Sequence, residues 1–281
     1  MYHIIFLLVL AGIWIVFASI QDLRKREVAD WLNFSLIIFA LGFRFFYCLF
    51  DAGTFAFFYQ GLIGLGIFFV IGNLLYYSHF FAGGDTKLLI ALGAVLPLSE
   101  SFMTNLNIFM IFFFIFLFVG AIYGLIYALV LAFSNFKKFR KEFGLLMKKN
   151  RFFIYPVMIL GLAFMIGGFI FERMIFYLGI LFFIFPYIYL LAKTVERVCM
   201  IKKISSRDLQ EGDWLEGNVK VGDKKIVAKW DGLSKSEIAL LKKSKKQVLI
   251  KQGIPYVPVF LISFLILIYF LWNSFWNFNI F

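Results

Sequence analysis

Seven apolar runs of roughly 20 residues limit what this chain can fold into more than any other feature of its sequence. They cover about residues 3–20, 31–50, 55–78, 104–134, 152–171, 174–192 and 256–276, and a shorter run covers 86–98. A helix needs about 20 apolar residues to cross the ~30 Å hydrocarbon core of a bilayer. Hydrophobic residues make up 63% of the chain, well above the roughly half found in soluble domains. The sequence therefore predicts an all-α polytopic membrane protein with about eight transmembrane helices, and with six to eight as the range.

Basic residues gather in alternate connections between these runs. Of the 28 Lys and Arg residues, 26 fall in the segments 21–30, 79–87, 135–151 and 193–255. Lys and Arg are enriched in cytoplasmic loops of membrane proteins. We therefore expect a multi-pass protein of the cell membrane whose N-terminus is outside and whose four basic segments face the cytosol. The net charge of +12 is explained by this topology, so the lipid bilayer is an expected partner and nucleic acid is not.

One long stretch, residues 197–254, has the composition of a soluble domain. Within it, 213–229 alternates apolar and polar residues around Gly217 and 222–223, which predicts short strands and a hairpin. Residues 234–246 predict a short helix with Ser234 as N-cap and Glu237 as its capping-box partner. We expect a transmembrane helical catalytic domain at 1–196, a small cytosolic α+β insert at 197–254 and a C-terminal transmembrane helix at 255–281. A solvated basic linker is the alternative for the insert.

The metal-binding side chains are few. The chain has two cysteines, Cys48 and Cys199, and two histidines, His3 and His79, all far apart in the sequence. Neither a zinc finger nor a zinc-protease helix motif can be assembled from them. The sequence predicts no metal site, no cofactor and no disulfide framework.

Two carboxylates stand at span boundaries on the same predicted face. Asp22 follows the first apolar run, and Asp85 precedes the short run at 86–98. Ionisable groups at membrane depth are costly and are therefore candidates for function. The alternatives without a catalytic role are that Asp22 is a hydrated charge in a loop and that Asp85 is the N-cap of a helix.

A pair of neighbouring carboxyl groups has a defined chemical use. Such a pair holds one proton between its members, so one member can act as a base on water while the other donates a proton to a scissile carbonyl. The residues before Asp85 are Ala82, Gly83 and Gly84, which leave little side chain where a peptide backbone must approach. Lys87 follows two residues later, either as a cation at the bilayer surface or as a group that changes the pKa of Asp85. The pattern predicts peptide hydrolysis by an aspartic pair.

Three motifs resemble those of the type IV prepilin peptidase and archaeal preflagellin peptidase family, whose second motif is GxGD. Residues 22–32 read DLRKREVADWL, similar to D-x-R-x-R-x-[IV]-P-[ND]-x-[LI], with Ala29 in place of Pro. Residues 82–88 read AGGDTKL, similar to GxGDxKL, with Ala82 in place of the first Gly. Residues 254–260 read IPYVPVF, similar to the I-P-F-x-P-F that opens the last helix of the family.

The resemblance implies a function and a site. It implies an aspartic endopeptidase with Asp22 and Asp85 as the dyad, acting at the cytosolic membrane face on pilin or archaellin precursors with positively charged leaders. The insert before the last helix and the lack of a four-cysteine motif resemble the archaeal branch. Acidic residues of the insert, such as Glu211, Asp213 and Glu216, are candidates for contact with the basic leader.

Two other functions compete with this one. A presenilin-like or signal-peptide-peptidase-like intramembrane protease shares the GxGD motif, but its first aspartate lies within a helix. A transporter or scaffold would use the aspartates to bind cations or to cap helices, but the expected symmetry of two similar halves is missing from the sequence.

Overall fold

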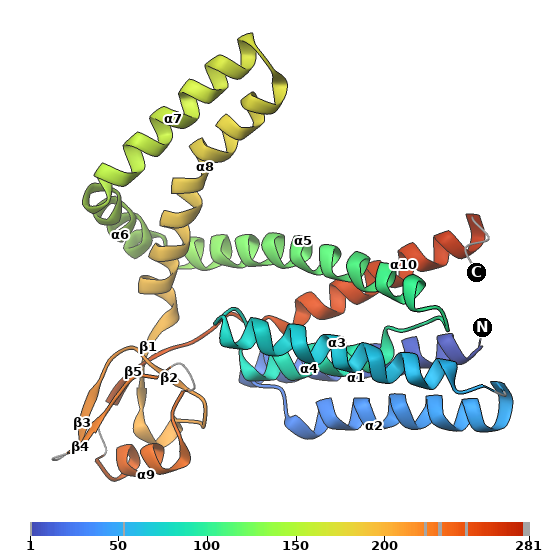
Figure 1. The fold of residues 1–281 in the computed structure, drawn as a ribbon. Helices are drawn as coiled ribbons and strands as arrows, with labels where there is room; N and C mark the ends of the chain where they lie inside the picture. The colour runs from blue at the N-terminus through green and yellow to red at the C-terminus, as the bar shows by residue number, and fades with distance from the viewer. Residues whose placement is uncertain (1, 53, 222–223, 230–231, 245–246, 278–281) are drawn as a thin grey trace. The chain divides into compact units, whose positions relative to one another are not determined.

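The computed structural model of the protein describes residues 2–52, 54–221, 224–229, 232–244 and 247–277. Within these residues, six helices are long and apolar enough to cross a membrane. They are α1 (Tyr2–Lys25), α2 (Asp30–Tyr47), α3 (Ala56–Tyr77), α5 (Phe102–Ser134), α7 (Arg151–Ile170) and α8 (Arg173–Val195), as Figure 1 shows. A polytopic membrane protein is confirmed.

The number of long spans is at the low end of the predicted range. The apolar run at 86–98 forms α4 (Gly83–Val95), which has 13 residues and is too short to cross a bilayer. The last helix, α10 (Val257–Asn277), also falls outside the six because its described apolar part, Val257–Asn273, is short. Six long helices among the described residues lie within the predicted range of six to eight, and the runs at 152–171 and 174–192 do form two long helices.

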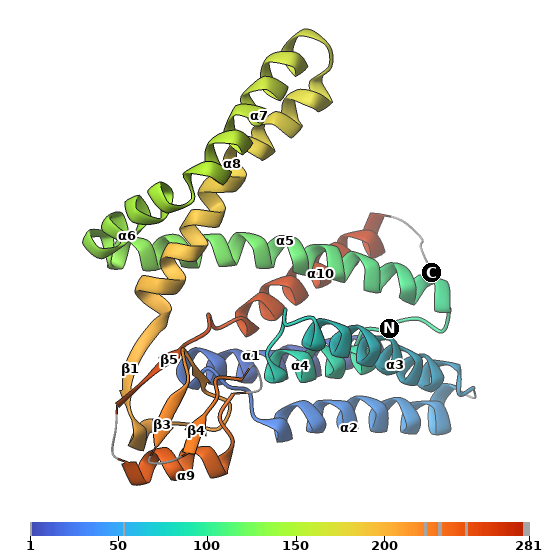
Figure 2. The same cartoon turned by 60° about the vertical axis from the view of Figure 1, so that its left-hand side comes forward.

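The chain divides into two compact units, one of residues 1–123 with 254–281 and one of residues 124–253. In the first unit, α1 to α4 lie side by side (Figures 1 and 2) and α10 contacts α1. The buried side of α1 follows the helical repeat through Leu7, Ala11, Ile15, Ala18 and Asp22. This stripe forms part of the unit's hydrophobic core and brings Asp22 to its edge.

The short helix α4 is surrounded by other helices of the first unit. It contacts α1, α2 and α3, and most of its side chains are buried. Its backbone touches that of α3, because a Cβ added at Gly64 would lie 2.4 Å from the carbonyl oxygen of Gly93. Small residues at such crossings allow helix backbones to approach closely in membranes. An α4 of 13 residues is therefore an interior helix whose depth is set by its neighbours.

The second unit contains a helical hairpin and the soluble insert. The amphipathic helix α6 (Phe136–Lys149) precedes the hairpin of α7 and α8, which is tightly packed at Gly161, Gly168 and Gly179. The π-helix η2 (Glu196–Met200) then leads from α8 into the insert. A second π-helical turn, η1 (Cys48–Ala52), extends α2 in the first unit.

The insert is a small α+β fold, as predicted. A three-stranded antiparallel sheet has the order β1 (Ile201–Ser205), β5 (Gln247–Lys251), β2 (Trp214–Leu215). A hairpin of β3 (Val219–Val221) and β4 (Lys224–Ile226) and the helix α9 (Lys235–Ser244) complete it, with the short turn η3 (Ser206–Asp208) after β1. The predicted capping box is present, since the Glu237 backbone N–H donates to the Ser234 hydroxyl and the Ser234 N–H donates to the Glu237 carboxylate. The residues 222–223 of the predicted turn lie outside the described residues.

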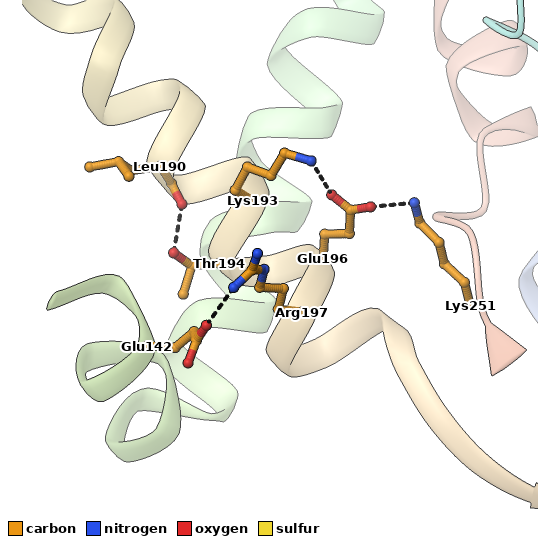
Figure 3. A network of polar contacts seen from close by, with 7 residues as sticks. All are labelled: Glu142, Leu190, Lys193, Thr194, Glu196, Arg197 and Lys251. Atoms are coloured by element: carbon orange, nitrogen blue, oxygen red, sulfur yellow. Dashed lines mark hydrogen bonds and ion pairs between the residues drawn. The ribbon is translucent and has the colours of Figure 1, made fainter. Parts of the chain in front are cut away.

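Ion pairs join the two ends of the insert where it leaves α8 (Figure 3). Glu196 accepts from Lys193 on α8 at 3.4 Å and also from Lys251 at the end of β5. Beside it, Arg197 pairs with Glu142 of α6 at 3.1 Å. Because β1 and β5 are neighbours in the sheet, Glu196 holds the first and last strands of the insert at one point.

Replacing Glu196 with Gln should loosen the end of β5. The Lys251–Glu196 pair is partly exposed, so its loss should cost about 1 kcal/mol or less. We expect hydrogen exchange of the β5 amides to become up to about fivefold faster. Glu142→Gln is the matched control, because it removes the neighbouring ion pair and leaves Lys251 paired. Equal exchange in both variants would show that Glu196 does not hold the strand.

Candidate functional site

Asp22 lies inside α1, in the last turn of the helix. It was expected just after the helix, but α1 continues to Lys25 and ends where Arg26 adopts a left-handed conformation with φ of 61°. The Arg26 N–H closes this turn by donating to the Asp22 carbonyl oxygen at 2.8 Å. Because the cations Arg24 and Lys25 favour the negative end of a helix dipole, they support the longer helix. The Asp22 side chain is consequently on the buried stripe, with 6% of it exposed.

The Asp22 carboxylate accepts hydrogen bonds from the beginning of α10. Its Oδ2 atom accepts from the Val257 N–H at 2.9 Å, and the backbone of Tyr256 also contributes. Val257 is the first residue of α10, where the helix leaves N–H groups unpaired and carries partial positive charge. The interaction stabilises negative charge on Asp22. No local signal in the sequence predicts it, since the two residues are 235 positions apart.

Asp85 lies in the first turn of α4, as its third residue. It was expected just before the helix, but α4 begins at Gly83 with Ala82 as N-cap. The Asp85 carboxylate reaches back to the backbone of Ala82, as an acidic residue at this helical position commonly does. The charges of Asp85 and Asp22 interact, so the structure brings together the two carboxylates that the motifs single out.

The glycines before Asp85 are not required by packing. A Cβ at Gly83 would lie 3.9 Å from Tyr76, and one at Gly84 would lie 3.5 Å from the backbone of Val28, both of which are ordinary contacts. Neither glycine has a positive φ. Ala82 is exposed and has an extended backbone that any residue adopts, so Ala in place of Gly causes no strain there. The small side chains at 82–84 therefore leave open backbone beside Asp85.

The departure at Ala29 has a local compensation. Ala29 has φ of −65°, the value that proline imposes. Its N–H donates to the side-chain oxygen of Gln21 at 3.1 Å. Proline could not make this bond, so the chain keeps the backbone shape of the motif and adds a hydrogen bond that ties the loop to α1.

Lys87 joins the two motifs. Its Nζ atom lies 2.6 Å from Oδ1 of Asp30, the first residue of α2, and both side chains are largely exposed. Lys87 therefore contacts the end of the Asp22 motif, eight residues beyond Asp22. The sequence alternatives for Lys87, a cation at the bilayer surface or a neighbour that tunes Asp85, had missed this partner.

Comparison with known proteins agrees with the motifs. Residues 9–129 match the sequence model of the type IV leader peptidase family. Over these residues, the chain is similar to the type IV leader peptidase family. The matched region contains the whole of α1 to α4 after residue 8, and with it both aspartates.

Two curated relatives extend the comparison. The chain is 30% identical over 89 residues to the preflagellin peptidase of Methanococcus maripaludis and 32% identical over 89 residues to that of Methanocaldococcus jannaschii. Each match covers 32% of this chain, and the chain spans 38% and 37% of these relatives' own lengths. No solved structure matches the chain. The match to the family model is confined to residues 9–129, the region that contains both aspartates.

Proposed function

We propose that this protein is a membrane aspartic endopeptidase that removes the positively charged leader peptide from prepilin-like or preflagellin (archaellin) precursors. The observation that carries the proposal is the electrostatic interaction between Asp22, which lies at the buried edge of α1, and Asp85 in the first turn of α4, two residues from motifs 63 positions apart. The match of residues 9–129 to the leader peptidase family and the similarity to two preflagellin peptidases support a leader peptide as substrate.

The environments of the two carboxyl groups suggest their roles. Asp22 receives backbone N–H groups at the start of α10, which favours its ionised form, so Asp22 takes a proton from the attacking water. Asp85 gives a proton to the oxygen of the scissile carbonyl as the water oxygen bonds to its carbon. The tetrahedral diol then collapses, the C–N bond breaks, and the leaving amine takes up a proton from the pair. A neighbouring pair that shares one proton is suited to this cycle.

The proposal also specifies a topology. The distribution of Lys and Arg supports an outside N-terminus, a cytosolic insert and an active site that faces the cytosol. In this scheme residues 1–196 supply the catalytic helices, 197–254 the cytosolic insert and 255–281 the last helix. The open backbone at Ala82, Gly83 and Gly84 is where the substrate strand approaches Asp85, with Lys87 held beside it by Asp30.

Cleavage of a defined precursor tests the function. The purified full-length chain in lipid nanodiscs is incubated with an archaellin precursor and, separately, with a prepilin, and the new N-terminus is read by mass spectrometry. We expect one cut between the basic leader and the hydrophobic helix in at least one precursor. Absence of cleavage in both would overturn the proposal, and cuts within the hydrophobic helix would indicate an intramembrane protease instead.

A further inference from the structure

The helix α6 lies between two long apolar helices with almost no connecting chain. α5 ends at Ser134, α6 covers Phe136–Lys149 and α7 begins at Arg151, so only Asn135 and Asn150 separate α6 from its neighbours. Both neighbours are long and apolar enough to cross a membrane. Figures 1 and 2 show α6 at one end of the α7–α8 hairpin. Because one residue of chain reaches only about 3.5 Å, a helix tethered in this way to two spans stays at a membrane surface.

One side of α6 is already covered by the second unit itself. Leu146 is buried with Ile154 of α7 and Leu190 of α8, and Phe143 and Met147 of α6 pack against this cluster. The three α6 residues are separated by one, three and four positions, a spacing that places them along one helical face. The apolar stripe of α6 therefore faces the α7–α8 hairpin and is not open to another molecule.

The other side of α6 is cationic and open. Lys138 and Lys141 precede Leu145 by seven and four residues, and Lys148 and Lys149 follow it by three and four, so the four lysines surround this leucine on one face. Together these five residues are the cationic face of α6. The four lysines are exposed, and 53% of Leu145 is exposed. An apolar side chain ringed by lysines fits the boundary between acyl chains and headgroups, because lysine stems lie along apolar surface while their ammonium groups reach polar groups.

Acidic side chains of the described residues do not neutralise this face. Residues 135–151 contain seven basic residues and one acidic residue, Glu142. The Glu142 carboxylate pairs with Arg197 of η2 at 3.1 Å, so its charge is balanced by a cation from outside α6 (Figure 3). None of the four lysines of the cationic face forms an ion pair with a carboxylate in the described part of the chain. Their charge is therefore available to an anionic partner outside the protein.

We propose that the cationic face of α6 is a docking surface for the anionic headgroups of membrane lipids. An anionic bilayer surface attracts each nearby Lys or Arg, and the attraction grows with the number of such residues. The tether to α5 and α7 keeps these lysines at the level of the headgroups, where Leu145 contacts the acyl boundary. The face repels a positively charged leader peptide, so it is separate from the site that would bind the substrate. The inference goes beyond the proposed function and does not depend on it.

The test measures how tightly fluorescent phosphatidylglycerol binds the purified full-length chain in a neutral detergent, with phosphatidylcholine of the same acyl chains as the zwitterionic probe. The unchanged protein should bind phosphatidylglycerol at least about fivefold more tightly than phosphatidylcholine. Replacing Lys138, Lys141, Lys148 and Lys149 together with Gln should weaken phosphatidylglycerol binding about tenfold or more and leave phosphatidylcholine binding unchanged. The same four changes to Arg keep the charges and should keep the preference. Equal phosphatidylglycerol affinity in the Gln variant and the unchanged protein overturns the proposal.

A matched control removes the same charge from the insert. Lys202 and Lys203 of β1 and Lys242 and Lys243 of α9 are exposed, and their replacement with Gln should change phosphatidylglycerol binding by less than about twofold. An equal loss in both Gln variants would mean that lipid responds to net charge alone and would contradict a site on α6. Displacement of the lipid by glycerol phosphate, or tighter binding of polyglutamate, would assign the face to a soluble anion and overturn the proposal. The midpoint of thermal unfolding without added lipid should be the same in all variants, because Gln, Arg and Lys have similar helix propensities.

Discussion

Leader cleavage should fall by a factor on the order of 10² to 10⁴ when either Asp22 or Asp85 is replaced with Asn, because each carries a proton transfer. Asparagine is the informative replacement. Its side-chain oxygen can still accept the Val257 N–H at position 22 and the Ala82 backbone at position 85, so the local fold is kept while the acid–base group is lost. The measurement is the single-turnover rate with a precursor that the unchanged protein cleaves.

Asp30→Asn is the matched control for this experiment. Asp30 is also a carboxylate at the start of a helix near Asp22, but it is exposed and pairs with Lys87. Its replacement should cost less than about 1 kcal/mol of stability and should leave kcat within a few-fold of its original value. A cleavage rate for Asp22→Asn or Asp85→Asn similar to that of the control would exclude that residue from the dyad.

Arg44→Met should destabilise the protein by about 3 kcal/mol or more. Arg44 is completely buried in α2, and its guanidinium donates at 3.0 Å to the carbonyl oxygens of Phe57, Ala94 and Val95 and also donates to that of Pro97. It also stacks over the ring of Phe57 at 4.1 Å. The carbonyls of Ala94 and Val95 are at the C-terminal end of α4, where no further helical N–H can reach them. Removing the guanidinium leaves buried carbonyls without donors, at about 1–3 kcal/mol each.

The check is the midpoint of thermal unfolding in detergent. We expect Arg44→Met to lower this midpoint by about 6 °C or more. The midpoint of Arg44→Lys should lie between those of Arg44→Met and the unchanged protein, since one ammonium cannot reach all four carbonyls. Arg173→Met removes an exposed arginine and should change the midpoint by less than about 2 °C. Gly61→Ala should act like Arg44→Met in milder form, because its Cβ would lie 2.6 Å from Cδ of Arg44. Equal midpoints for the two arginine variants would contradict a structural role for Arg44.

Arg44 also explains how the short apolar run at 86–98 can form a buried helix. A run of 13 helical residues cannot cross a bilayer, but it can lie inside the protein if its end carbonyls find donors. Arg44 supplies those donors from α2, about 50 positions earlier in the chain. Arg44 lies within the apolar run at 31–50, which the sequence predicts as a span. Its depth in an apolar run was the signal that could have marked it.

The structure removes one argument against an intramembrane protease. That rival was set aside because its first aspartate lies within a helix, and Asp22 also lies within one. The match of residues 9–129 to the type IV leader peptidase family is now the observation that favours a leader peptidase over an intramembrane protease. The position of the cut relative to the hydrophobic helix of the substrate tests it directly.

Features that depend on a few neighbouring residues were predictable. The capping box of Ser234 and Glu237 was confirmed, because its two hydrogen bonds join residues three positions apart. The long helices and the insert followed from apolar periodicity and composition, which act over one or two turns. The end of α1 was misplaced by five residues, from 20 to Lys25, and the start of α4 by three, from 86 to Gly83, since a helix end depends on which partner takes its last free groups.

The sequence by itself determined that the chain crosses a membrane, and its motifs singled out Asp22 and Asp85. Only the tertiary structure decided that these two charges interact and that the Val257 N–H donates to Asp22. The physical reason is the range of the forces. Burial of apolar surface selects helices from local composition, whereas a hydrogen bond acts over about 3 Å and forms only after packing has brought distant helices together.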